Sequence, residues 1–211
     1  MATTSSESNL GSVDGGAVRA ATQALADPGP WAVTAFATTS FILGWYNAGE
    51  ISSASLPLVF PVAFFFGGLV QIIVACFEVG RGNLFGAVVF GTYGPFWVIF
   101  AAIETWFAPK VHSAAAADNG VALFLAMFAV VSFYFWIASF RTDAVLVVVI
   151  GLIWIGLGLL AWGFSGGHTT LIKAGGWVTV AFAILAWYHA AADMVNFTFK
   201  RPMLPLGRIA A

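Results

Sequence analysis

Residues 56–77 read LPLVFPVAFFFGGLVQIIVACF, and this stretch decides the class of fold. Its 22 residues include no charged side chain, and Gln71 is the only amide among them. A helix needs about 20 apolar residues to cross the hydrocarbon core of a bilayer. Pro57 and Pro61 lie in the first turns of such a helix, where a missing backbone N–H costs little. The stretch therefore predicts a membrane-spanning helix.

Five further apolar stretches follow the same pattern, each bounded by a short polar break. The whole chain is 61% hydrophobic and 8% charged, whereas a soluble domain carries about 25% charged residues. We therefore expect an all-α integral membrane protein, a bundle of six transmembrane helices. It would occupy residues 27–199, between a flexible tail over 1–26 and a C-terminal tail over 200–211. The predicted spans are 31–48, 56–77, 84–107, 120–140, 144–164 and 174–195.

The positive charges are divided unevenly between the two sides of such a bundle. The side that would hold both termini carries six Lys and Arg residues, and the opposite side carries two. Because cytoplasmic loops carry the excess of positive charge, both tails are predicted to be cytoplasmic, in a plasma membrane. A net charge of −1 leaves no basic footprint for nucleic acid. The six are Arg19, Arg81, Arg141, Lys200, Arg201 and Arg208; the two are Lys110 and Lys173.

Polar side chains recur along single faces of the predicted helices. A polar group in hydrocarbon is costly unless it faces protein or water, so each face predicts either a passage or hydrogen bonds between packed helices. In the first span, Thr34 and Thr38 lie one turn apart, and Asn47 lies near the end. The longer stripes are Phe60, Phe64, Gly67, Gln71, Ala75 and Glu78; Tyr93, Trp97, Phe100 and Glu104; and Gly175, Thr179, Phe182, Ala186, His189, Asp193 and Asn196.

Several of these residues have two open roles. Gln71, Thr34 and Thr38 either line a passage or join helices. Glu78 either lines the passage or marks a span end at the lipid headgroups. His189 and Asp193 either form a structural i,i+4 contact or relay protons.

Motifs typical of enzymes are absent from the sequence. It contains no G-x-S-x-G, H-E-x-x-H or C-x-x-C pattern and no phosphate-binding loop. We therefore expect no enzyme, and no resident cofactor or metal. Cys76 stands alone in an apolar run, where a cysteine behaves as a small hydrophobic residue.

Short motifs spread over residues 27–207 resemble the acetate uptake transporter family, which includes bacterial succinate–acetate permeases. D-P-G-P-W at 27–31 is similar to the N-P-A-P-L-G-L signature that opens the first span of that family. Asp27 replaces the signature asparagine and adds negative charge at the helix entrance. The other matching motifs are F-G-G-L-V-Q (66–71), E-V-G-R-G-N-L-F-G (78–86), T-Y-G-P-F-W (92–97), A-G-G-W (174–177) and M-L-P-L-G (203–207).

The resemblance implies a homo-hexameric ring with one pore in each protomer. It implies uptake of acetate, in some members succinate, often together with a proton. It places a hydrophobic constriction at Phe36, Tyr93 and Ile153, and a position that tunes substrate size at Ala186. His189 is not typical of the family. Further positions that match the family are Asn47, Gln71, Glu78, Asn83 and Asn196.

The expected function is transport of acetate, and of other small monocarboxylates or succinate, by a channel or with protons. Phe36 and Ile153 would form a dry gate, and Tyr93, Asn47 and Gln71 would donate hydrogen bonds to the carboxylate. Thr34, Thr38, Trp97 and Ala186 would line the rest of the pore. Asp27, Glu78, His189, Asp193 and Asn196 would lie at the mouths or handle protons.

Two alternatives remain open. One is a channel for small neutral solutes such as ammonia or urea, because an aromatic, hydrophobic gate also suits those. The other is a membrane scaffold that transports nothing, in which the polar stripes are packed shut.

Overall fold

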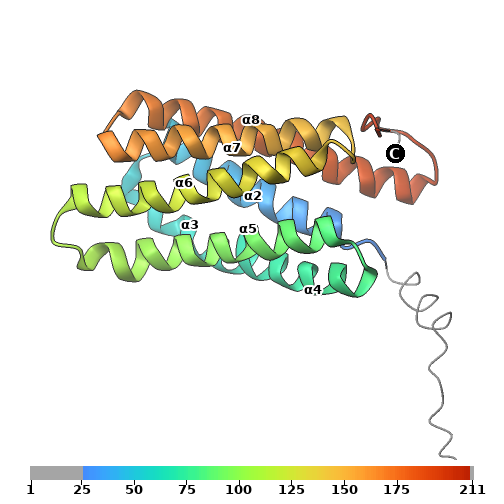
Figure 1. Ribbon diagram of the computed structural model, residues 1–211, viewed down its shortest axis with the longest axis horizontal. Helices are drawn as coiled ribbons and strands as arrows, with labels where there is room; N and C mark the ends of the chain where they lie inside the picture. Colours follow the sequence, from blue (N-terminus) through green and yellow to red (C-terminus); the bar gives the residue numbers. More distant parts are fainter. Residues whose placement is uncertain (1–25, 210–211) are drawn as a thin grey trace, which may run out of the picture.

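Every regular element among residues 26–209, the part of the chain that this computed structural model describes, is helical (Figure 1). The predicted flexible tail over 1–26 therefore lies outside the described residues, apart from Ala26. The helices are α2 (Gly29–Ala48), α3 (Val59–Pro61), α4 (Gln71–Arg81), α5 (Leu84–Ala102), α6 (Ala114–Ser139), α7 (Ala144–Gly166) and α8 (Thr169–Phe199). Short 3-10 or π segments extend them, namely η1 (Ser53–Leu58), η2 (Val62–Val70), η3 (Ile103–Phe107) and η4 (Ala108–Lys110).

Five helical segments are long and apolar enough to cross a membrane, so the chain is a multi-pass membrane protein. Large apolar side chains on their outer faces are exposed, as lipid requires; Leu123 and Trp162, for example, are each 64% exposed. The shorter α2 contains five side chains with a hydroxyl group and is not one of these five segments. The five segments are Ser53–Arg81, Leu84–Lys110, Ala114–Ser139, Ala144–Gly166 and Thr169–Phe199.

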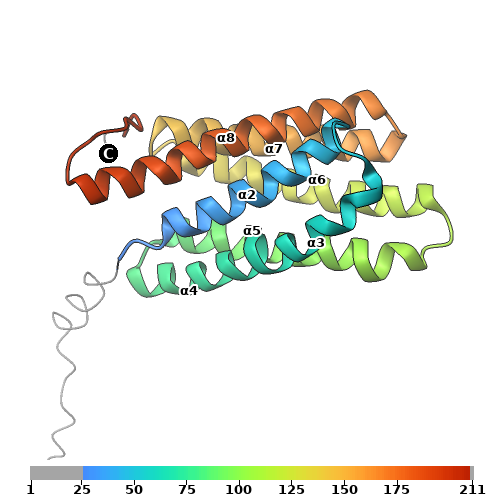
Figure 2. The ribbon, with the colours of Figure 1, turned by 180° about the vertical axis from the view of Figure 1, so that it is seen from behind.

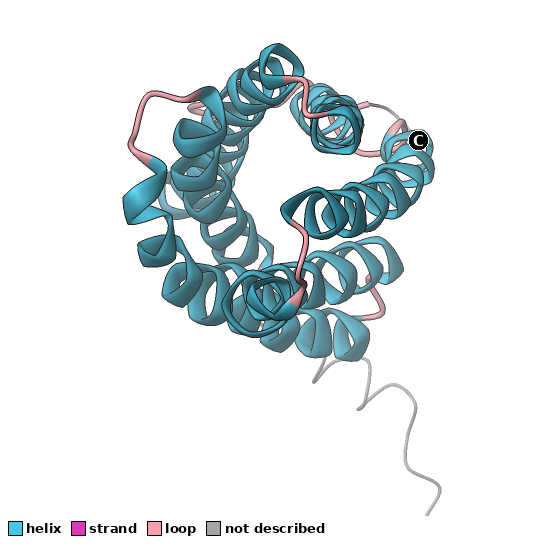
Figure 3. Cartoon of the chain, turned by 90° about the vertical axis from the view of Figure 1, so that its left-hand side faces the viewer, coloured by secondary structure: helices cyan, strands magenta, loops and turns pink. Residues whose placement is uncertain are grey.

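The helices surround a common axis (Figure 3) and run alternately up and down along it (Figures 1 and 2). The C-terminus lies at the end of the bundle where α2 begins, and the α2–η1 connection lies at the opposite end (Figures 1 and 2). We call these the terminal end and the loop end. Because α2 and α5 both run from the terminal end to the loop end, residues one turn further along either helix lie one level nearer the loop end.

Small residues bring α2 against its neighbours. A Cβ atom on Gly44 would lie 2.9 Å from Val180 Cγ2 of α8, so only glycine permits this approach. A Cβ atom on Gly67 of η2 would likewise lie 2.8 Å from Thr39 Oγ1 and 2.9 Å from Trp97 Cγ. These contacts hold Trp97 of α5 close to α2.

The residues predicted to share one face between 60 and 78 do face the interior of the bundle, although η2 is wound as a π-helix. Gly67, Gln71 and Glu78 are buried, and Phe64 is half-buried. The C-terminal residues 200–209 fold back onto the start of α7, where the Ala144 amide donates to the Gly207 carbonyl at 2.9 Å. This segment is therefore part of the folded domain.

Candidate functional site

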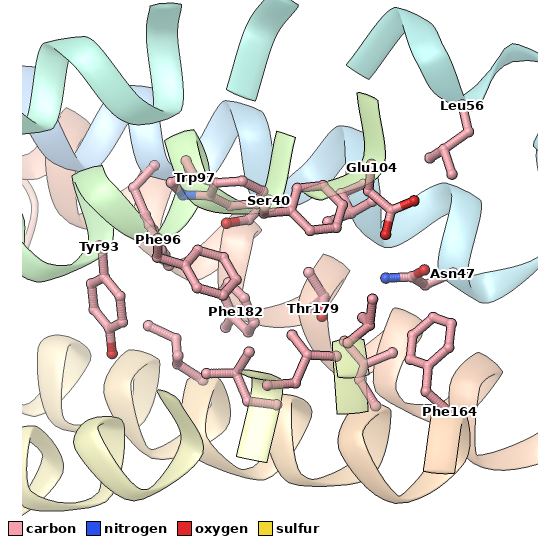
Figure 4. A pocket seen from close by; sticks show the side chains of 18 of the residues that line it. Ser40, Asn47, Leu56, Tyr93, Phe96, Trp97, Glu104, Phe164, Thr179 and Phe182 are labelled. Carbon is pink, nitrogen blue, oxygen red and sulfur yellow. The ribbon is translucent and has the colours of Figure 1, made fainter. Parts of the chain in front are cut away.

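A cavity of about 150 Å³ lies inside the bundle, between α2, α5, α6, α7 and α8 (Figure 4). That volume is well above the roughly 10–15 Å³ that one water molecule needs. Most of its wall is aromatic or aliphatic. The lining residues are Phe36, Ser40, Leu43, Asn47, Leu56, Tyr93, Phe96, Trp97, Phe100, Glu104, Asp118, Val121, Leu125, Ile153, Leu157, Leu160, Phe164, Thr179 and Phe182.

The floor of the cavity, toward the terminal end, is a layer of buried apolar side chains, which we call the gate layer. Phe36 is central to it: its ring centroid lies 5.3 Å from that of Tyr93 and 5.8 Å from that of Phe182. Ile153 of α7 also lines the cavity and is 3% exposed. The structure thus brings the three residues of the predicted constriction together, and it adds Phe182.

The hydroxyl group of Tyr93 is bound away from the gate. It donates to Ser132 Oγ of α6 at 2.8 Å, and Ser132 in turn donates to the Phe128 carbonyl at 2.7 Å. Tyr93 therefore lines the cavity while its hydroxyl joins α5 to α6.

A second layer lies one helical turn nearer the loop end and contains three polar side chains; we call it the polar layer. Ser40 follows Phe36 by four residues on α2, and Trp97 follows Tyr93 by four on α5. Thr179 of α8 lies at the same level, and its hydroxyl donates to the Gly175 carbonyl at 2.8 Å. Ser40 Oγ and Trp97 Nε1 have no hydrogen-bond partner among the described residues.

Asn47, Glu104 and Asp118 line the cavity at its loop end, which we call the mouth. Figure 4 shows Asn47 and Glu104 together at the end opposite Tyr93. Asp118, on α6, is exposed. The lining residues given above include no Lys, Arg or His, so the fixed charges of the mouth are negative.

Four predicted pore-lining residues do not line this cavity. Gln71 is fully buried, and its amide nitrogen donates to the Gly67 carbonyl within the same helical segment. Thr34 donates to the Pro30 carbonyl, and Thr38 accepts from Trp187 Nε1 at 3.1 Å, joining α2 to α8. Ala186 lies one turn from Phe182 toward the terminal end and is 1% exposed.

The start of α2 is tied to the end of α4 by charged groups. Arg81 donates to Asp27 Oδ1 at 2.7 Å, and Asn83 donates to Glu78 Oε2 at 2.9 Å. Partial burial opposes ionisation of Asp27, but the hydrogen bonds from Arg81 and the Gly29 amide outweigh it and lower the pKa of that carboxyl. Asp27 therefore stays ionised at neutral pH, and its Oδ1 also accepts from the amide of Gly29, the first residue of α2, at 2.9 Å.

The second polar cluster at the terminal end centres on His189. Its Nε2 lies 3.0 Å from Asp143 Oδ2, and its Nδ1 lies 3.5 Å from Asp193 Oδ2. Asp143 also caps α7 by accepting from the Leu146 amide at 2.8 Å. The predicted pairing of His189 with Asp193 is thus the longer of two contacts, and the shorter one comes from a different helix.

Asn196 fixes the C-terminal segment. Its side chain accepts from the amides of Met203 at 2.7 Å and Leu204 at 2.9 Å, and it donates to the Leu204 carbonyl. None of these atoms reaches the cavity.

The sequence interpretation missed four residues that the geometry singles out. Asp143 and Ser132 act through partners on other helices, and no spacing within one helix reveals such partners. Asp118 lies in a predicted outer loop and first becomes part of the cavity when α6 begins at Ala114. Ser40 could have been predicted from the sequence, because it follows Phe36 by four residues on the same face of α2.

Comparisons with known proteins agree with this architecture. A family model described as the GPR1/FUN34/yaaH family matches residues 10–207. The chain is 28% identical over 184 residues to the Escherichia coli succinate-acetate/proton symporter SatP, covering 87% of this chain and 96% of SatP. It is 30% identical over 190 residues to ammonia transport outward protein 2 of Saccharomyces cerevisiae, covering 88% of this chain and 67% of that protein.

A solved structure shows the same fold. It is described as the bacterial acetate channel SatP, and it aligns with a TM-score of 0.79 at 26% identity. The alignment covers 87% of this chain and 99% of that structure. By their names, these relatives are transporters or channels.

Proposed function

Because this chain belongs to the GPR1/FUN34/yaaH family, we propose that it carries acetate and similar small carboxylic acids across a membrane. The resemblance to SatP over nearly its whole length supports this substrate class. The observation that carries the proposal is the cavity itself. It is a small apolar chamber inside a membrane bundle, closed at one end by the gate layer.

The chemistry of the gate suits a short monocarboxylate. Taking a bare charge into an apolar medium costs tens of kcal/mol in the idealised limit, so a carboxyl group needs polar partners on its way to the gate. The polar residues that line the cavity are Ser40, Trp97 and Thr179, one turn from the gate layer, and Asn47, Glu104 and Asp118 at the mouth. A methyl group packs well against aromatic rings, whereas the second carboxylate of succinate would face the same rings at a higher cost.

The finer topology is part of the same proposal. Six spans are proposed, with α2 as the first, since α2 packs along α8 and supplies Phe36 to the gate layer. Both termini are proposed to face the cytoplasm of a plasma membrane, on the strength of the Lys and Arg distribution. A homo-hexamer with one pore per protomer is proposed from the family resemblance.

The ionisable residues of the terminal end are proposed to hold the helices together at the inner side of the path. Both Glu78 and His189 are buried. Glu78 is hydrogen-bonded to Asn83 at 2.9 Å, and His189 to Asp143 at 3.0 Å. Asp193 or Glu78 is also proposed to take part in moving protons. Asn196 is proposed to clamp the C-terminal segment.

Ammonia transport is a second candidate function, favoured by the relative from Saccharomyces cerevisiae. The acidic mouth formed by Glu104 and Asp118 would attract ammonium, and the gate layer would pass the neutral base. Labelled methylammonium is therefore the first competitor to test against acetate.

Uptake into proteoliposomes tests the proposed function. The full-length protein would be reconstituted, and labelled acetate uptake would be followed with and without an inward proton gradient. Uptake above that of protein-free vesicles supports acetate transport, and acceleration by the gradient supports a linked proton. Methylammonium uptake without acetate uptake would transfer the assignment to the second candidate. If neither solute crosses through folded protein, the scaffold alternative replaces both.

A further inference from the structure

A groove of about 1200 Å³ lies at the terminal end of the bundle. Its walls are the start of α2, the last turns of α8 and the C-terminal segment, which lie at the same end of the molecule (Figure 2). The groove shares no lining residue with the cavity that the gate layer closes. It is therefore a separate site, and the transport path described above does not use it.

Three cationic side chains line this groove, namely Lys200, Arg201 and Arg208. All three residues are exposed, and none of them forms an ion pair within residues 26–209. Their positive charges are therefore available to a bound molecule.

The two acidic residues of the groove, Asp27 and Asp193, do not cancel this charge. Asp27 accepts from Arg81 at 2.7 Å, and Asp193 Oδ2 lies 3.5 Å from His189 Nδ1. Three cations against two acids, one of which is held by Arg81, leave the groove positively charged. Such a groove attracts anions.

The segment that carries the cations is fixed to the bundle at several points. The clamp made by Asn196 holds its first turn, the Tyr188 hydroxyl donates to the Pro205 carbonyl at 2.7 Å, and the Ile209 amide donates to the Thr142 carbonyl at 3.0 Å. The cations at 200–201 and at 208 thus stand at the two ends of a hydrogen-bonded turn. A site that is ordered in advance loses less freedom on binding.

The length of α8 places these cations at the level of the lipid headgroups. The helix has 31 residues, and at 1.5 Å per residue it is about 46 Å long. A bilayer with its headgroup regions is about 40–45 Å thick. Lys200 follows the last residue of α8 directly, so it lies where phosphate groups are found.

The rest of the groove wall is apolar and open. Trp31, Met194 and Phe197 line the groove, and they are 47%, 61% and 79% exposed. Exposed apolar side chains on a membrane helix face acyl chains, and Trp is enriched at the membrane interface. The groove therefore places positive charge beside a surface that suits hydrocarbon.

A ligand that covers both parts of the wall must carry an anionic group and hydrocarbon chains. A soluble anion would leave the apolar side chains uncovered, and a zwitterionic lipid would bring a cation of its own to a positive groove. Basic pockets between transmembrane helices are known to bind anionic headgroups. These features point to one class of lipid.

We propose that the groove binds an anionic glycerophospholipid. Its phosphate lies between Lys200, Arg201 and Arg208, and its acyl chains run along Met194 and Phe197. The bound lipid links the C-terminal segment to the start of α2. The proposal depends on the membrane-spanning architecture and not on the transported solute, so the acetate experiments and this one fail independently.

Lipid binding to the full-length protein tests the site. Delipidated protein in detergent is titrated with dioleoylphosphatidylglycerol, and the bound lipid is counted by native mass spectrometry. Dioleoylphosphatidylcholine tests the need for net negative charge, and inorganic phosphate added as a competitor tests the need for acyl chains. We expect phosphatidylglycerol to bind more tightly than phosphatidylcholine and to resist displacement by phosphate. Equal binding of the two lipids, or displacement by an equal concentration of phosphate, would overturn the proposal.

Neutral variants locate the bound lipid. Lys200 has a φ of 52°, a backbone region that asparagine tolerates, so Lys200→Asn removes the charge and keeps the end of the helix. Arg201→Gln and Arg208→Gln remove the other two charges. Each variant should bind phosphatidylglycerol roughly fivefold more weakly than wild type and phosphatidylcholine equally well.

The matched control is Arg141→Gln. Arg141 is exposed and follows α6 at the terminal end, but it does not line the groove. Its variant should bind phosphatidylglycerol as wild type does. Equal affinities for Arg141→Gln and all three groove variants would overturn the proposal.

A second copy of the chain is the rival occupant of the groove, and the same spectra report it. Loss of an oligomer in the variant that lacks all three cations, with unchanged affinity for phosphatidylglycerol, would make the groove a protein contact and overturn the proposal. Thermal unfolding in phosphatidylcholine checks the folding of each variant, and the single variants decide if the triple variant does not fold. Added phosphatidylglycerol should raise the thermal midpoint of wild type and Arg141→Gln more than that of the groove variants.

Discussion

Several polar side chains at the terminal end are paired with one another, whereas two polar side chains on the cavity wall have no hydrogen-bond partner in the described structure. At the terminal end, charged residues are joined across helices: Arg81 to Asp27 at 2.7 Å and His189 to Asp143 at 3.0 Å. In the polar layer, Ser40 and Trp97 are just as buried, yet their polar atoms have no partner in the described structure.

This difference separates two uses of polarity inside a membrane protein. A polar side chain in hydrocarbon must face protein, water or a ligand, so a paired group is explained by the fold. Glu78 Oε1 and His189 Nδ1 also lack hydrogen bonds, but the other side-chain polar atom of each residue is bonded to a neighbouring helix or loop. Ser40 and Trp97 differ from them, because the single polar side-chain atom of each has no hydrogen-bond partner among the described residues.

The gate layer offers the largest expected effect. Phe36→Ala removes the ring that contacts both Tyr93 and Phe182. A barrier lowered by about 1.4 kcal/mol raises flux tenfold, so we expect faster uptake of acetate and a smaller preference over larger acids. Labelled uptake of acetate and butyrate measures both. Phe65→Ala, at a side chain that is 68% exposed, is the control. Unchanged flux and selectivity in Phe36→Ala would remove the gate assignment.

Breaking the His189 pair should affect stability and spare substrate affinity. Asp143→Ala leaves His189 without its nearest partner and removes the cap of α7. Removal of one partner from a buried pair costs about 3–5 kcal/mol, so a large fall in the thermal midpoint of the solubilised protein is expected. Asp143→Asn keeps one oxygen for the cap of α7 and puts an N–H donor where His189 meets the second oxygen, so it should lose less stability than Asp143→Ala. A raised KM for acetate in the Asn variant would instead make this cluster part of the binding path.

Tyr93→Phe distinguishes the ring of Tyr93 from its hydroxyl. Since the hydroxyl donates to Ser132, its loss should cost about 1 kcal/mol of stability and leave the KM for acetate nearly unchanged. A severalfold rise in the KM for acetate would mean that the hydroxyl reaches the substrate. Ser132→Ala provides the paired comparison, and it should resemble Tyr93→Phe in stability.

The smallest effect is expected at Asp27. Its pKa is lowered in the folded protein, so its stabilising contribution is present above the ordinary carboxyl pKa of about 3.9 and is lost as the pH falls through the lowered value. The Asp27 side chain is 60% exposed, so Asp27→Asn should cost less than about 0.5 kcal/mol at neutral pH. The thermal midpoints of the wild-type protein and Asp27→Asn, measured from pH 7 to pH 3, should approach each other as the pH falls. A difference between the two midpoints that grows toward low pH would contradict the lowered pKa of Asp27.

The helical architecture was largely predictable because lipid restricts spanning segments to long apolar helices. The predicted start of the third span at residue 84 coincides with the start of α5, which follows Gly82, a left-handed C-cap, and Asn83, an N-cap. Three of the four residues of the gate layer, Phe36, Tyr93 and Ile153, were named from motif positions, and all three line the same cavity. The stripe at Tyr93, Trp97, Phe100 and Glu104 was also visible, because four-residue spacing places side chains on one face.

The rest of the site depended on contacts between helices. Gln71 and Thr38 look like pore residues in a one-dimensional pattern, but their hydrogen bonds are made with helix backbone and with Trp187. His189 was paired with Asp193 because both lie on one helix, whereas Asp143 is 46 residues away. Packing between helices, which the sequence does not state, selected the partners of Thr38 and His189.

The central claim is that substrate crosses through the cavity, and obstruction of the cavity tests it most directly. Leu157 lines the cavity on α7, whereas Val148 on the same helix is 49% exposed on the outer face. Labelled acetate uptake would be measured for Leu157→Trp and Val148→Trp in proteoliposomes, with folding checked by thermal unfolding. The account predicts that Leu157→Trp loses most of its uptake while Val148→Trp retains it. Full uptake by folded Leu157→Trp protein would contradict the account, because the substrate would then take another path.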